Sequence, residues 1–294
     1  MSLREYLAGQ QQLVDRELDR LVPGESVPPA TIHRAMRYSL FAGGKRIRPL
    51  LCLAAAGAVS CDTDGAVTTA CTLEFIHTYS LIHDDLPALD NDDYRRGKLT
   101  CHKVFGDAIA ILAGDALLTL AFQVLSTGLT VDGQRKALLI GELSEAAGTV
   151  GGMIGGQVAD LEGEGQPPDA ALLESIHRAK TGALLRASVR MGAIYAGAGP
   201  DQLAALSAYG QHIGLAFQMI DDILDVEESS ESLGKTAGKD ARQQKITFPA
   251  VYGLAESKRM ADDELREAHV ALEPFGAPAQ RLRDLADLIV RRKT

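Results

Sequence analysis

The sequence predicts an all-α protein, a single-domain multi-helix bundle over residues 1–294. Apolar residues recur at helical spacing through nearly the whole chain, whereas strand-like alternation is scarce and no solenoid repeat occurs. Several segments are apolar around most of their circumference, which is typical of central helices in a multi-helix layer. We therefore expect about ten or more helices in one domain.

The helices can be assigned in chain order from apolar runs and the breaks between them. Helix-like spacing occurs in residues 31–44, 48–59, 66–85, 107–126, 135–148 and 202–226. Breaks fall at Pro23–Pro29, Cys61–Gly65, Gly97–Thr100, Thr127–Gly133, Gly163–Asp169, Gly197–Pro200, Glu227–Gly238 and Pro274–Pro278. We interpret these breaks as helix connections rather than domain linkers. The glycines within residues 151–161 fit either close helix packing or close approach to a ligand.

The composition is that of an ordinary soluble globular protein, with 46% hydrophobic and 23% charged residues. The net charge is -9, and no block of five or six like charges occurs, so we expect no nucleic-acid partner. The N-terminal residues carry charges throughout and lack an apolar signal core. No run reaches the roughly 18 apolar residues of a membrane span. We expect a cytoplasmic protein that holds any anionic ligand with local cations.

The cysteines give no sign of a metal or disulfide framework. Four cysteines occur, at positions 52, 61, 71 and 101, without the CxxC spacing of zinc or redox sites. Four cysteines are too few to staple a chain of this length. We expect reduced thiols that are mostly packed in the core.

The first of two aspartate clusters lies at the end of an apolar run. Asp84 and Asp85 close the run 66–85, and Pro87 cannot donate a backbone hydrogen bond, so the helix should distort there. On an ideal helix Asp90 points about 120° away from Asp84. The two aspartates therefore share a metal site only if the distortion brings Asp90 back.

The second cluster, Asp221, Asp222 and Asp225, also lies against apolar sequence. Four residues apart, Asp221 and Asp225 share a helix face, where like charges cost about 0.2–0.5 kcal/mol per pair. A cationic ligand would offset that cost. Because Mg2+ binds one or two carboxylates and receives other ligands from substrate phosphates, two such clusters indicate a polyphosphate site. An isolated DDxxD, by contrast, is usually a solvated helix face.

Basic groups accompany the acidic clusters. Paired arginines are typical of surface charge when isolated, but next to carboxylates they suit a diphosphate bridged by Mg2+. The cationic positions are Arg95 and Arg96; Lys45, Arg46 and Arg48 within GGKRIRP; Lys180 beside Thr181; and Lys235, Lys239 and Lys245. GGKRIRP lacks the spacing of a phosphate-binding P-loop, although its glycines permit close approach of backbone to ligand.

Taken together, these motifs resemble the trans-isoprenyl diphosphate synthases, and most closely the short-chain bacterial farnesyl diphosphate synthases. The motifs stand in family order as GGKRIRP, LEFIHTYSLIHDDLPALDNDDYRRG, CHKVFGDAIAILAGDALL, GGQVADL, HRAKTGALL, GLAFQMIDDILD, LGKTAGKD and KITFPAVYGL. The resemblance implies helices around a deep apolar cavity, usually a homodimer, with three Mg2+ at the mouth; Mn2+ is an alternative metal.

The resemblance also implies a role for each site residue. Metal is assigned to Asp84, Asp85, Asp90, Asp221, Asp222 and Asp225. The allylic diphosphate is assigned to Arg95, Lys180, Thr181, Gln218, Lys235 and Lys245, and isopentenyl diphosphate to Gly44, Lys45, Arg48, His77 and Arg96. The residues expected to act in catalysis are Asp84, Asp85, Arg95, Lys180, Thr181, Gln218, Asp221 and Lys235.

The implied reaction is head-to-tail, all-trans condensation of dimethylallyl or geranyl diphosphate with isopentenyl diphosphate. Tyr79 lies five residues before Asp84, and the small Ser80 follows it. Tyr79 resembles the aromatic residue that bacterial farnesyl diphosphate synthases carry at this position. About 7.5 Å below Asp84, its ring would act as a floor for a fifteen-carbon product. The alternatives are a geranylgeranyl diphosphate synthase, a terpene cyclase, a noncatalytic regulatory subunit and an acidic divalent-ion-binding protein. A cyclase does not need the separate basic group GGKRIRP.

Overall fold

The computed structural model confirms the all-α fold class and describes residues 2–61, 63–167, 169–231 and 246–292. By internal contacts the chain forms two compact units. The first comprises Met1–Leu53 and Thr63–Ile140, and the second comprises Ala54–Asp62 and Gly141–Thr294. Each unit is described by itself.

The described part of the first unit contains five complete helices and a short hairpin. Parts of α3 (Ile47–Val59) and α7 (Gly133–Ala147) also fall within its bounds. The elements are α1 (Leu3–Leu21), α2 (Ala30–Leu40), α4 (Ala66–Asp84), β1 (Tyr94–Arg95), β2 (Lys98–Leu99), α5 (Cys101–Phe105) and α6 (Asp107–Thr127). The antiparallel pair β1–β2 has only two residues in each strand, which is why its sequence shows no strand-like alternation.

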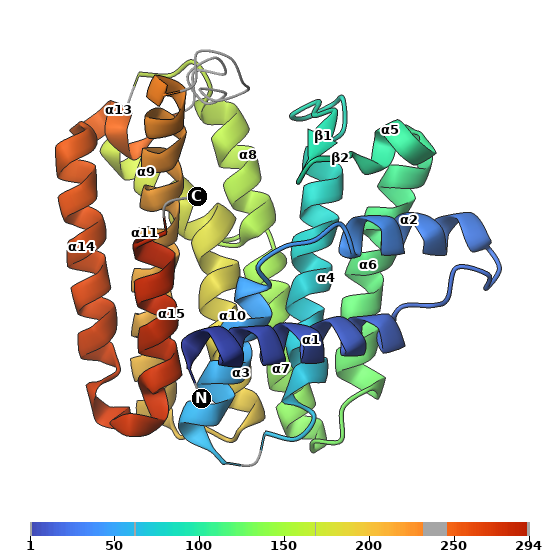
Figure 1. The fold of residues 1–294 in the computed structure, drawn as a ribbon, viewed down its shortest axis with the longest axis horizontal. Helices are drawn as coiled ribbons and strands as arrows, with labels where there is room; N and C mark the ends of the chain where they lie inside the picture. Colours follow the sequence, from blue (N-terminus) through green and yellow to red (C-terminus); the bar gives the residue numbers. More distant parts are fainter. Residues whose placement is uncertain (1, 62, 168, 232–245, 293–294) are drawn as a thin grey trace. The chain divides into compact units, whose positions relative to one another are not determined.

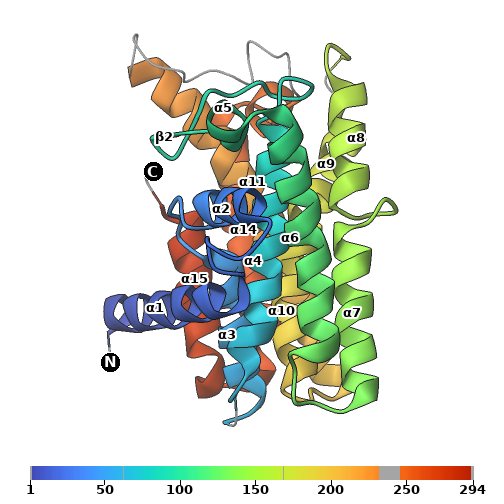
Figure 2. The same cartoon turned by 90° about the vertical axis from the view of Figure 1, so that its right-hand side faces the viewer.

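Helix α4 is the central element of the first unit. It packs along α6 and also contacts α1 and α2, and Figures 1 and 2 both show α4 and α6 side by side. Its buried residues lie on all sides and include polar ones such as Thr72 and Glu74. This burial agrees with the prediction that helices apolar around their circumference are central.

Helix α6 is, within the described residues, the one helix long and apolar enough to cross a membrane, with a mean hydropathy of 2.0 over its most apolar window. A core helix meets the same criteria of length and composition. In this structure α6 contacts α2, α4 and α5. These contacts bury only 39% of its most apolar window, and Ile111 and Leu112 are exposed.

The second unit is arranged around one long helix, α11 (Pro200–Glu231, 32 residues). Its other complete elements are α8 (Met153–Gly163), α9 (Ala170–His177), a π-helical turn η1 (Arg178–Gly182), α10 (Ala183–Tyr195), α13 (Phe248–Tyr252), α14 (Leu254–Ala271), the short 3-10 turns η2 (Glu273–Phe275) and η3 (Ala277–Ala279), and α15 (Gln280–Val290). Helices α10, α14 and α15, which are labelled in Figure 1, all contact α11. The turn η1 contacts it as well.

Most predicted breaks coincide with the connections in the structure. Helices α1 and α2 are separated at Pro23–Pro29, and α3 and α4 at Cys61–Gly65. The exception is the break placed at Glu227–Gly238, because α11 continues to Glu231. Residues 232–238 lie outside the described part of the chain. Nothing in the local sequence EESSE forbids helix, so the acidic run extends α11 instead of ending it.

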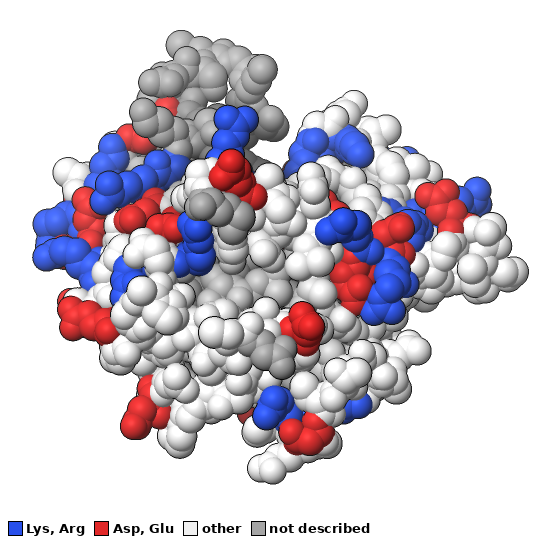
Figure 3. All heavy atoms as spheres, turned by 60° about the horizontal axis from the view of Figure 1, so that its bottom comes forward, with Lys and Arg blue, Asp and Glu red and all other residues white. Residues whose placement is uncertain are grey.

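The thiols and surface charges are distributed as the composition indicated. Cys52, Cys71 and Cys101 are buried free thiols and Cys61 is exposed, and burial raises the pKa of Cys52 to about 12. On the face drawn in Figure 3, basic and acidic side chains are neighbours. Charges on this face therefore occur next to charges of opposite sign.

Candidate functional site

The loop after α4 brings the first aspartate cluster back over the helix end. Helix α4 ends at Asp84, and the amide of Leu86 donates to the carbonyl of His83. The amide of Asp90 then donates to the carbonyl of Asp84 at 2.8 Å, and that of Asp92 to the carbonyl of Asp85 at 3.2 Å. The predicted distortion at Pro87 is thus confirmed, and the backbone of Asp90 returns to that of Asp84.

Asp85 is buried and holds Arg95. Both Nε and Nη2 of Arg95 contact Oδ1 of Asp85, at 2.7 Å and 2.6 Å. Burial raises the pKa of the Asp85 carboxyl, although Arg95 opposes that shift. Burial lowers the pKa of Arg95, but Asp85, Asp84 and Asp92 together outweigh burial and leave that pKa raised. Arg95 is therefore a fixed cation beside Asp84, and Asp85 is the residue that fixes it.

The hairpin β1–β2 positions Arg95 and Arg96. Arg95 pairs with Lys98 across the turn, in which Gly97 has a φ of 75°. The hydroxyl of Thr100 donates to the carbonyl of Asp92 at 2.8 Å and ties the end of the hairpin to the aspartate loop. One short element therefore links the carboxylates to two arginines.

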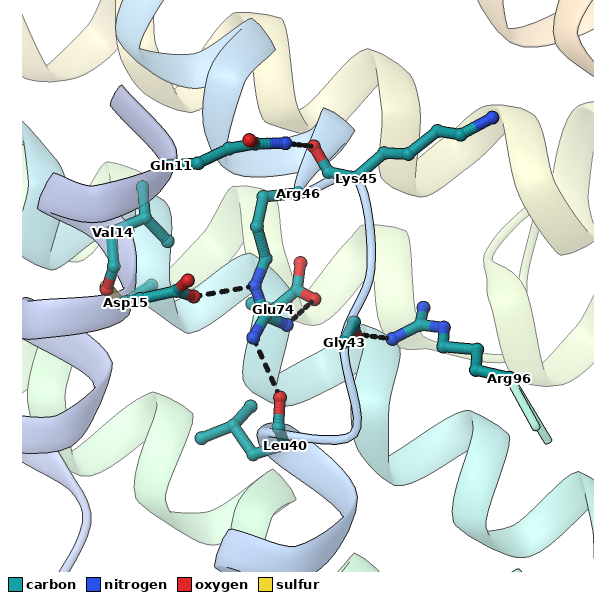
Figure 4. A network of polar contacts seen from close by, with 10 residues as sticks. Gln11, Val14, Asp15, Leu40, Gly43, Lys45, Arg46, Glu74 and Arg96 are labelled. Carbon is teal, nitrogen blue, oxygen red and sulfur yellow. Dashed lines mark hydrogen bonds and ion pairs between the residues drawn. The ribbon is translucent and has the colours of Figure 1, made fainter. Parts of the chain in front are cut away.

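Arg46 in GGKRIRP is a structural residue. Its guanidinium donates to Asp15 at 3.0 Å, to Glu74 at 2.6 Å and to the carbonyl of Leu40 at 2.8 Å, as Figure 4 shows. A buried arginine with this many partners is a paired charge that holds the loop in place. Figure 4 shows the side chain of Lys45 extending away from this network.

Gly44 is required by the position of Arg96. Arg96 donates through Nη1 to the carbonyl of Gly43, and a Cβ on Gly44 would lie 2.6 Å from that same nitrogen. Gly44 also has a φ of 133°, which side chains disfavour. GGKRIRP and Arg96 are thus in contact, as expected for residues assigned to the same diphosphate.

His77 lies among these cations. Burial lowers its pKa well below 6.5, and the positive charges of Arg48, Arg96 and Arg95 lower it further. His77 and Asp84 are seven residues apart on α4, about 20° around the helix axis, so they share a face. The structure therefore places a neutral imidazole, three arginines and Asp84 in one neighbourhood.

Tyr79 lies on another side of α4. Its ring meets that of His83 edge to face at 5.8 Å, and Nε2 of His83 is 3.0 Å from the carbonyl of Ile111 on α6. Tyr79 is 5% exposed, and its hydroxyl is buried without a hydrogen-bond partner. Burial, and then the charge of Asp84, raise the pKa of Tyr79 to about 12. Ser80 donates its hydroxyl to the carbonyl of His77.

In the second unit Asp222 is an internal acceptor. It is 3% exposed and accepts hydrogen bonds from the side chain of Gln218 at 3.0 Å and from the amide of Phe248 at 2.9 Å. Nε2 of His177 lies 3.4 Å from the same carboxylate, and the His177 ring stacks on that of Phe248. Asp222 thereby joins α11 to the start of α13.

Asp221 contacts a cation from the end of the chain. Arg292 donates to the Asp221 carboxylate and to the carbonyl of Phe217, and its guanidinium lies 4.1 Å from the centre of the Phe217 ring. Asp225 follows one turn later on α11 and is partly exposed. A metal bound to Asp221 must share this carboxylate with Arg292 or displace it.

Lys180 and Thr181 lie on the π-helical turn η1. Lys180 donates to Asp160 on α8 at 2.7 Å, and Thr181 donates to Gln218 on α11 at 3.0 Å. A Cβ on Gly156 would lie 2.2 Å from the Lys180 amide nitrogen, so the glycines of α8 do serve close packing against η1. π-helical turns are frequent at functional sites, where they re-aim side chains.

The predicted site residues thus form two groups, one in each unit. Asp84, Asp85, Asp90, Arg95, Arg96, Gly44, Lys45, Arg48, His77, Tyr79 and Ser80 belong to the first, and Lys180, Thr181, Gln218, Asp221, Asp222 and Asp225 to the second. Lys235, Lys239 and Lys245 lie outside the described residues. Among the residues that the structure describes, no three carboxylate, histidine or cysteine groups are gathered as a ready-made metal site.

Sequence reasoning missed three residues that hold the site. Glu74 pairs with Arg46, Asp160 pairs with Lys180, and Arg292 pairs with Asp221. Asp160 lies in GGQVADL, where a lone acid after a glycine-rich segment was the available signal. No sequence signal indicated Glu74 or Arg292, because their partners are far away in sequence.

Known proteins resemble this chain over nearly its whole length. The sequence model of the family described as polyprenyl synthetase matches residues 29–273. The chain is 51% identical to the dimethylallyltranstransferase of Fischerella ambigua (strain UTEX 1903), covering 99% of this chain and 84% of that protein. It is 45% identical to the farnesyl diphosphate synthase of Geobacillus stearothermophilus, covering 99% and 98%. The crystal structure of geranylgeranyl pyrophosphate synthetase from Pyrococcus horikoshii Ot3 matches with a TM-score of 0.89 at 30% identity, covering 99% and 98%.

Proposed function

The chain belongs to the polyprenyl synthetase family, and from this premise we propose that it makes mainly farnesyl diphosphate from isopentenyl diphosphate and dimethylallyl or geranyl diphosphate. It is a short-chain trans-prenyltransferase, and its relatives include farnesyl and geranylgeranyl diphosphate synthases. The observation that carries the proposal is the grouping of Asp84, Arg95, Arg96, His77 and Arg48 in the first unit. Such a group suits diphosphates, because guanidinium groups bind phosphate oxygens in pairs.

Two features of the first unit support separate positions for two diphosphates. Arg95 is held by Asp85 at the aspartate loop, next to the carboxylates that suit a metal-bridged diphosphate. Arg96 lies instead against the GGKRIRP loop, near Arg48 and His77. We assign the allylic diphosphate to the Arg95 side and isopentenyl diphosphate to the Arg96 side.

The donor set fits Mg2+. Carboxylate oxygens are hard ligands, and we assign to Mg2+ the six aspartates Asp84, Asp85, Asp90, Asp221, Asp222 and Asp225. Asp85 and Asp222 also bind partners within the protein. Bound Mg2+ would neutralise charge on the diphosphate as it leaves. Three ions per active site, as in the family, and Mn2+ as an alternative remain predictions.

In the proposed reaction the allylic carbon–oxygen bond breaks, and diphosphate departs with the electron pair. Arg95 holds that diphosphate in place through charge-assisted hydrogen bonds. The family resemblance assigns the same role to Lys180, in the second unit, and to Lys235, outside the described residues. The double bond of isopentenyl diphosphate, positioned by Arg48 and Arg96, then attacks the cation, and the departed diphosphate takes up the proton that leaves the new adduct. Thr181 and Gln218 offer dipoles but no nucleophile that the cation would alkylate readily.

Tyr79 supports a fifteen-carbon product. Its ring is buried on the α6 side of α4, about 7.5 Å along the helix from Asp84, where a chain growing down that side would meet it. Geranylgeranyl diphosphate is the second candidate product, favoured by the mixture of names among the relatives. Assembly as a homodimer and a cytoplasmic location also remain predictions.

Release of inorganic diphosphate by the purified chain tests the proposed function. We expect release only when an allylic diphosphate and isopentenyl diphosphate are both present. Release from the allylic substrate alone would indicate a cyclase, and no release under any condition would indicate a noncatalytic subunit. Asp84→Asn should remove the activity, whereas the matched variant Asp93→Asn, at an exposed aspartate paired with Lys103, should keep it. Equal activities in these two variants would overturn the assignment of Asp84.

A further inference from the structure

The second unit contains a cavity that the proposed reaction does not use. Its volume is 240 Å3, and Ser175, Arg178, Gly182, Arg186 and Gln211 are among the residues that line it. Residues of the π-helical turn η1 line part of the cavity, but Lys180 and Thr181 of that turn do not. The cavity therefore needs an explanation of its own.

Arg186 is the residue that points to a ligand. Arg186 is half-buried, and its Nε is buried without a hydrogen-bond partner within the described ranges of the chain. A buried donor without an acceptor destabilises the protein, and a guanidinium cannot lower that cost by losing its proton. A buried Nε without a partner at a cavity wall thus indicates a missing hydrogen-bond acceptor.

The packing of α10 against α11 holds Arg186 in this position. A Cβ on Gly210 would lie 2.9 Å from Cα of Arg186, and one on Gly214 would lie 2.8 Å from Cα of Gly182. The two helices therefore approach at backbone distance along this line. The stem of Arg186 is confined between them, so its guanidinium cannot easily turn away to another partner.

The other polar groups of the cavity are one further cation and neutral donors. Arg178 donates to Glu174 at 2.8 Å and 2.5 Å, which offsets its charge. Ser175 and Gln211 are exposed and supply a hydroxyl and an amide. The net excess is one positive charge, that of Arg186. The volume is below the roughly 300–1,000 Å3 typical of sites for drug-sized ligands.

From these features we propose that the cavity binds a small phosphate-type oxyanion. Planar guanidinium groups match the oxygens of phosphate in pairs, and the cavity offers two such groups with a hydroxyl and an amide beside them. Free inorganic phosphate or diphosphate, or the head group of a prenyl diphosphate, provides this chemistry. The site rests on Arg186 and its cavity and does not depend on the proposed reaction.

Calorimetric titration of the full-length chain in metal-free buffer tests the proposal, with inorganic diphosphate as the probe. The background is Arg48→Gln, which weakens the isopentenyl diphosphate group assigned in the first unit, and the metal-free buffer weakens the allylic one. In this background we expect saturable binding that Arg186→Gln weakens roughly tenfold or more, because a hydrogen-bonded charge is lost. Arg259→Gln, the same change at an exposed arginine on α14, is the matched control and should leave the affinity unchanged.

A second variant tests the proposal if Arg186→Gln does not fold. Gln211 is exposed, so Gln211→Glu should fold, and its negative charge should weaken diphosphate binding to a similar degree. Parallel titrations with inorganic phosphate and with farnesyl diphosphate identify the source, since binding of the prenyl form alone would assign the site to a head group. Affinities for all three probes that neither Arg186→Gln nor Gln211→Glu changes would overturn the proposal, whatever the outcome for catalysis.

Discussion

Replacement of Tyr79 separates its two roles, as packing residue and as floor for the product. The side chain is 5% exposed, and its ring contacts that of His83. Truncation of a buried aromatic to alanine costs about 3–5 kcal/mol, a large part of the 5–15 kcal/mol by which proteins are stable. Tyr79→Ala should therefore unfold at clearly lower denaturant concentration and, while folded, shift products toward twenty carbons or more.

Tyr79→Phe is the matched control for this experiment. The hydroxyl of Tyr79 is buried without a partner, so its removal leaves no new unsatisfied group. We expect Tyr79→Phe to be within about 1 kcal/mol of wild type in unfolding free energy and to give the same products. Both quantities can be measured on the same preparations, by urea unfolding and by chromatography of dephosphorylated products.

Two results would refute this reasoning. An unaltered product pattern in Tyr79→Ala would show that the ring does not limit chain length. Longer products from Tyr79→Phe would show that the hydroxyl, and not the ring, sets the limit. The pKa of Tyr79, raised to about 12, adds a further check, because a ring that stays neutral should give a constant product pattern between pH 7 and pH 9.

Further predictions concern the metal, the two diphosphates and pH. Asp84→Ala or Asp221→Ala should lower turnover about a thousandfold or more with unchanged helicity by circular dichroism, and near-normal turnover in either would remove its metal assignment. Arg48→Ala should mainly raise the Michaelis constant for isopentenyl diphosphate and Lys235→Ala should mainly slow allylic ionisation; an allylic effect alone from Arg48→Ala would reverse the division of sites. Because the folded pKa of His77 lies well below 6.5, the unfolded chain takes up its proton first as pH falls, and stability is lost below about pH 6.5. His77→Gln should reduce that loss in urea unfolding at pH 5 relative to pH 7.5, and an unchanged difference would contradict the buried neutral imidazole.

Local sequence was sufficient for the helices with continuous apolar runs and for the turn in the first aspartate cluster, but it did not single out α1, α14 or α15. Pro87 cannot continue the hydrogen bonding of α4, and the helix does end at Asp84. Pro23–Pro29 and Cys61–Gly65 separate helices as predicted. At Glu227 the same approach was wrong, because a run of acidic and serine residues lowers helix propensity without ending a helix that is long and well packed.

The roles of individual charges could not be predicted, because they depend on partners far away in sequence. Arg46 and Arg48 are two residues apart, yet Arg46 is buried against Glu74, 28 residues away, while Arg48 acts on His77. Asp221 meets Arg292 from 71 residues away. Nearby residues of one motif therefore have different partners, and only the fold distinguishes them.

The most direct test of the central claim is the product that purified wild-type protein forms from dimethylallyl diphosphate and isopentenyl diphosphate with Mg2+. Chromatography and mass measurement of the dephosphorylated alcohols give chain length without any assumption about the site. We predict mainly the fifteen-carbon, all-trans product, with a ten-carbon intermediate at early times. Mainly twenty-carbon product would contradict the assigned chain length, and the absence of any condensation product would contradict the proposed function itself.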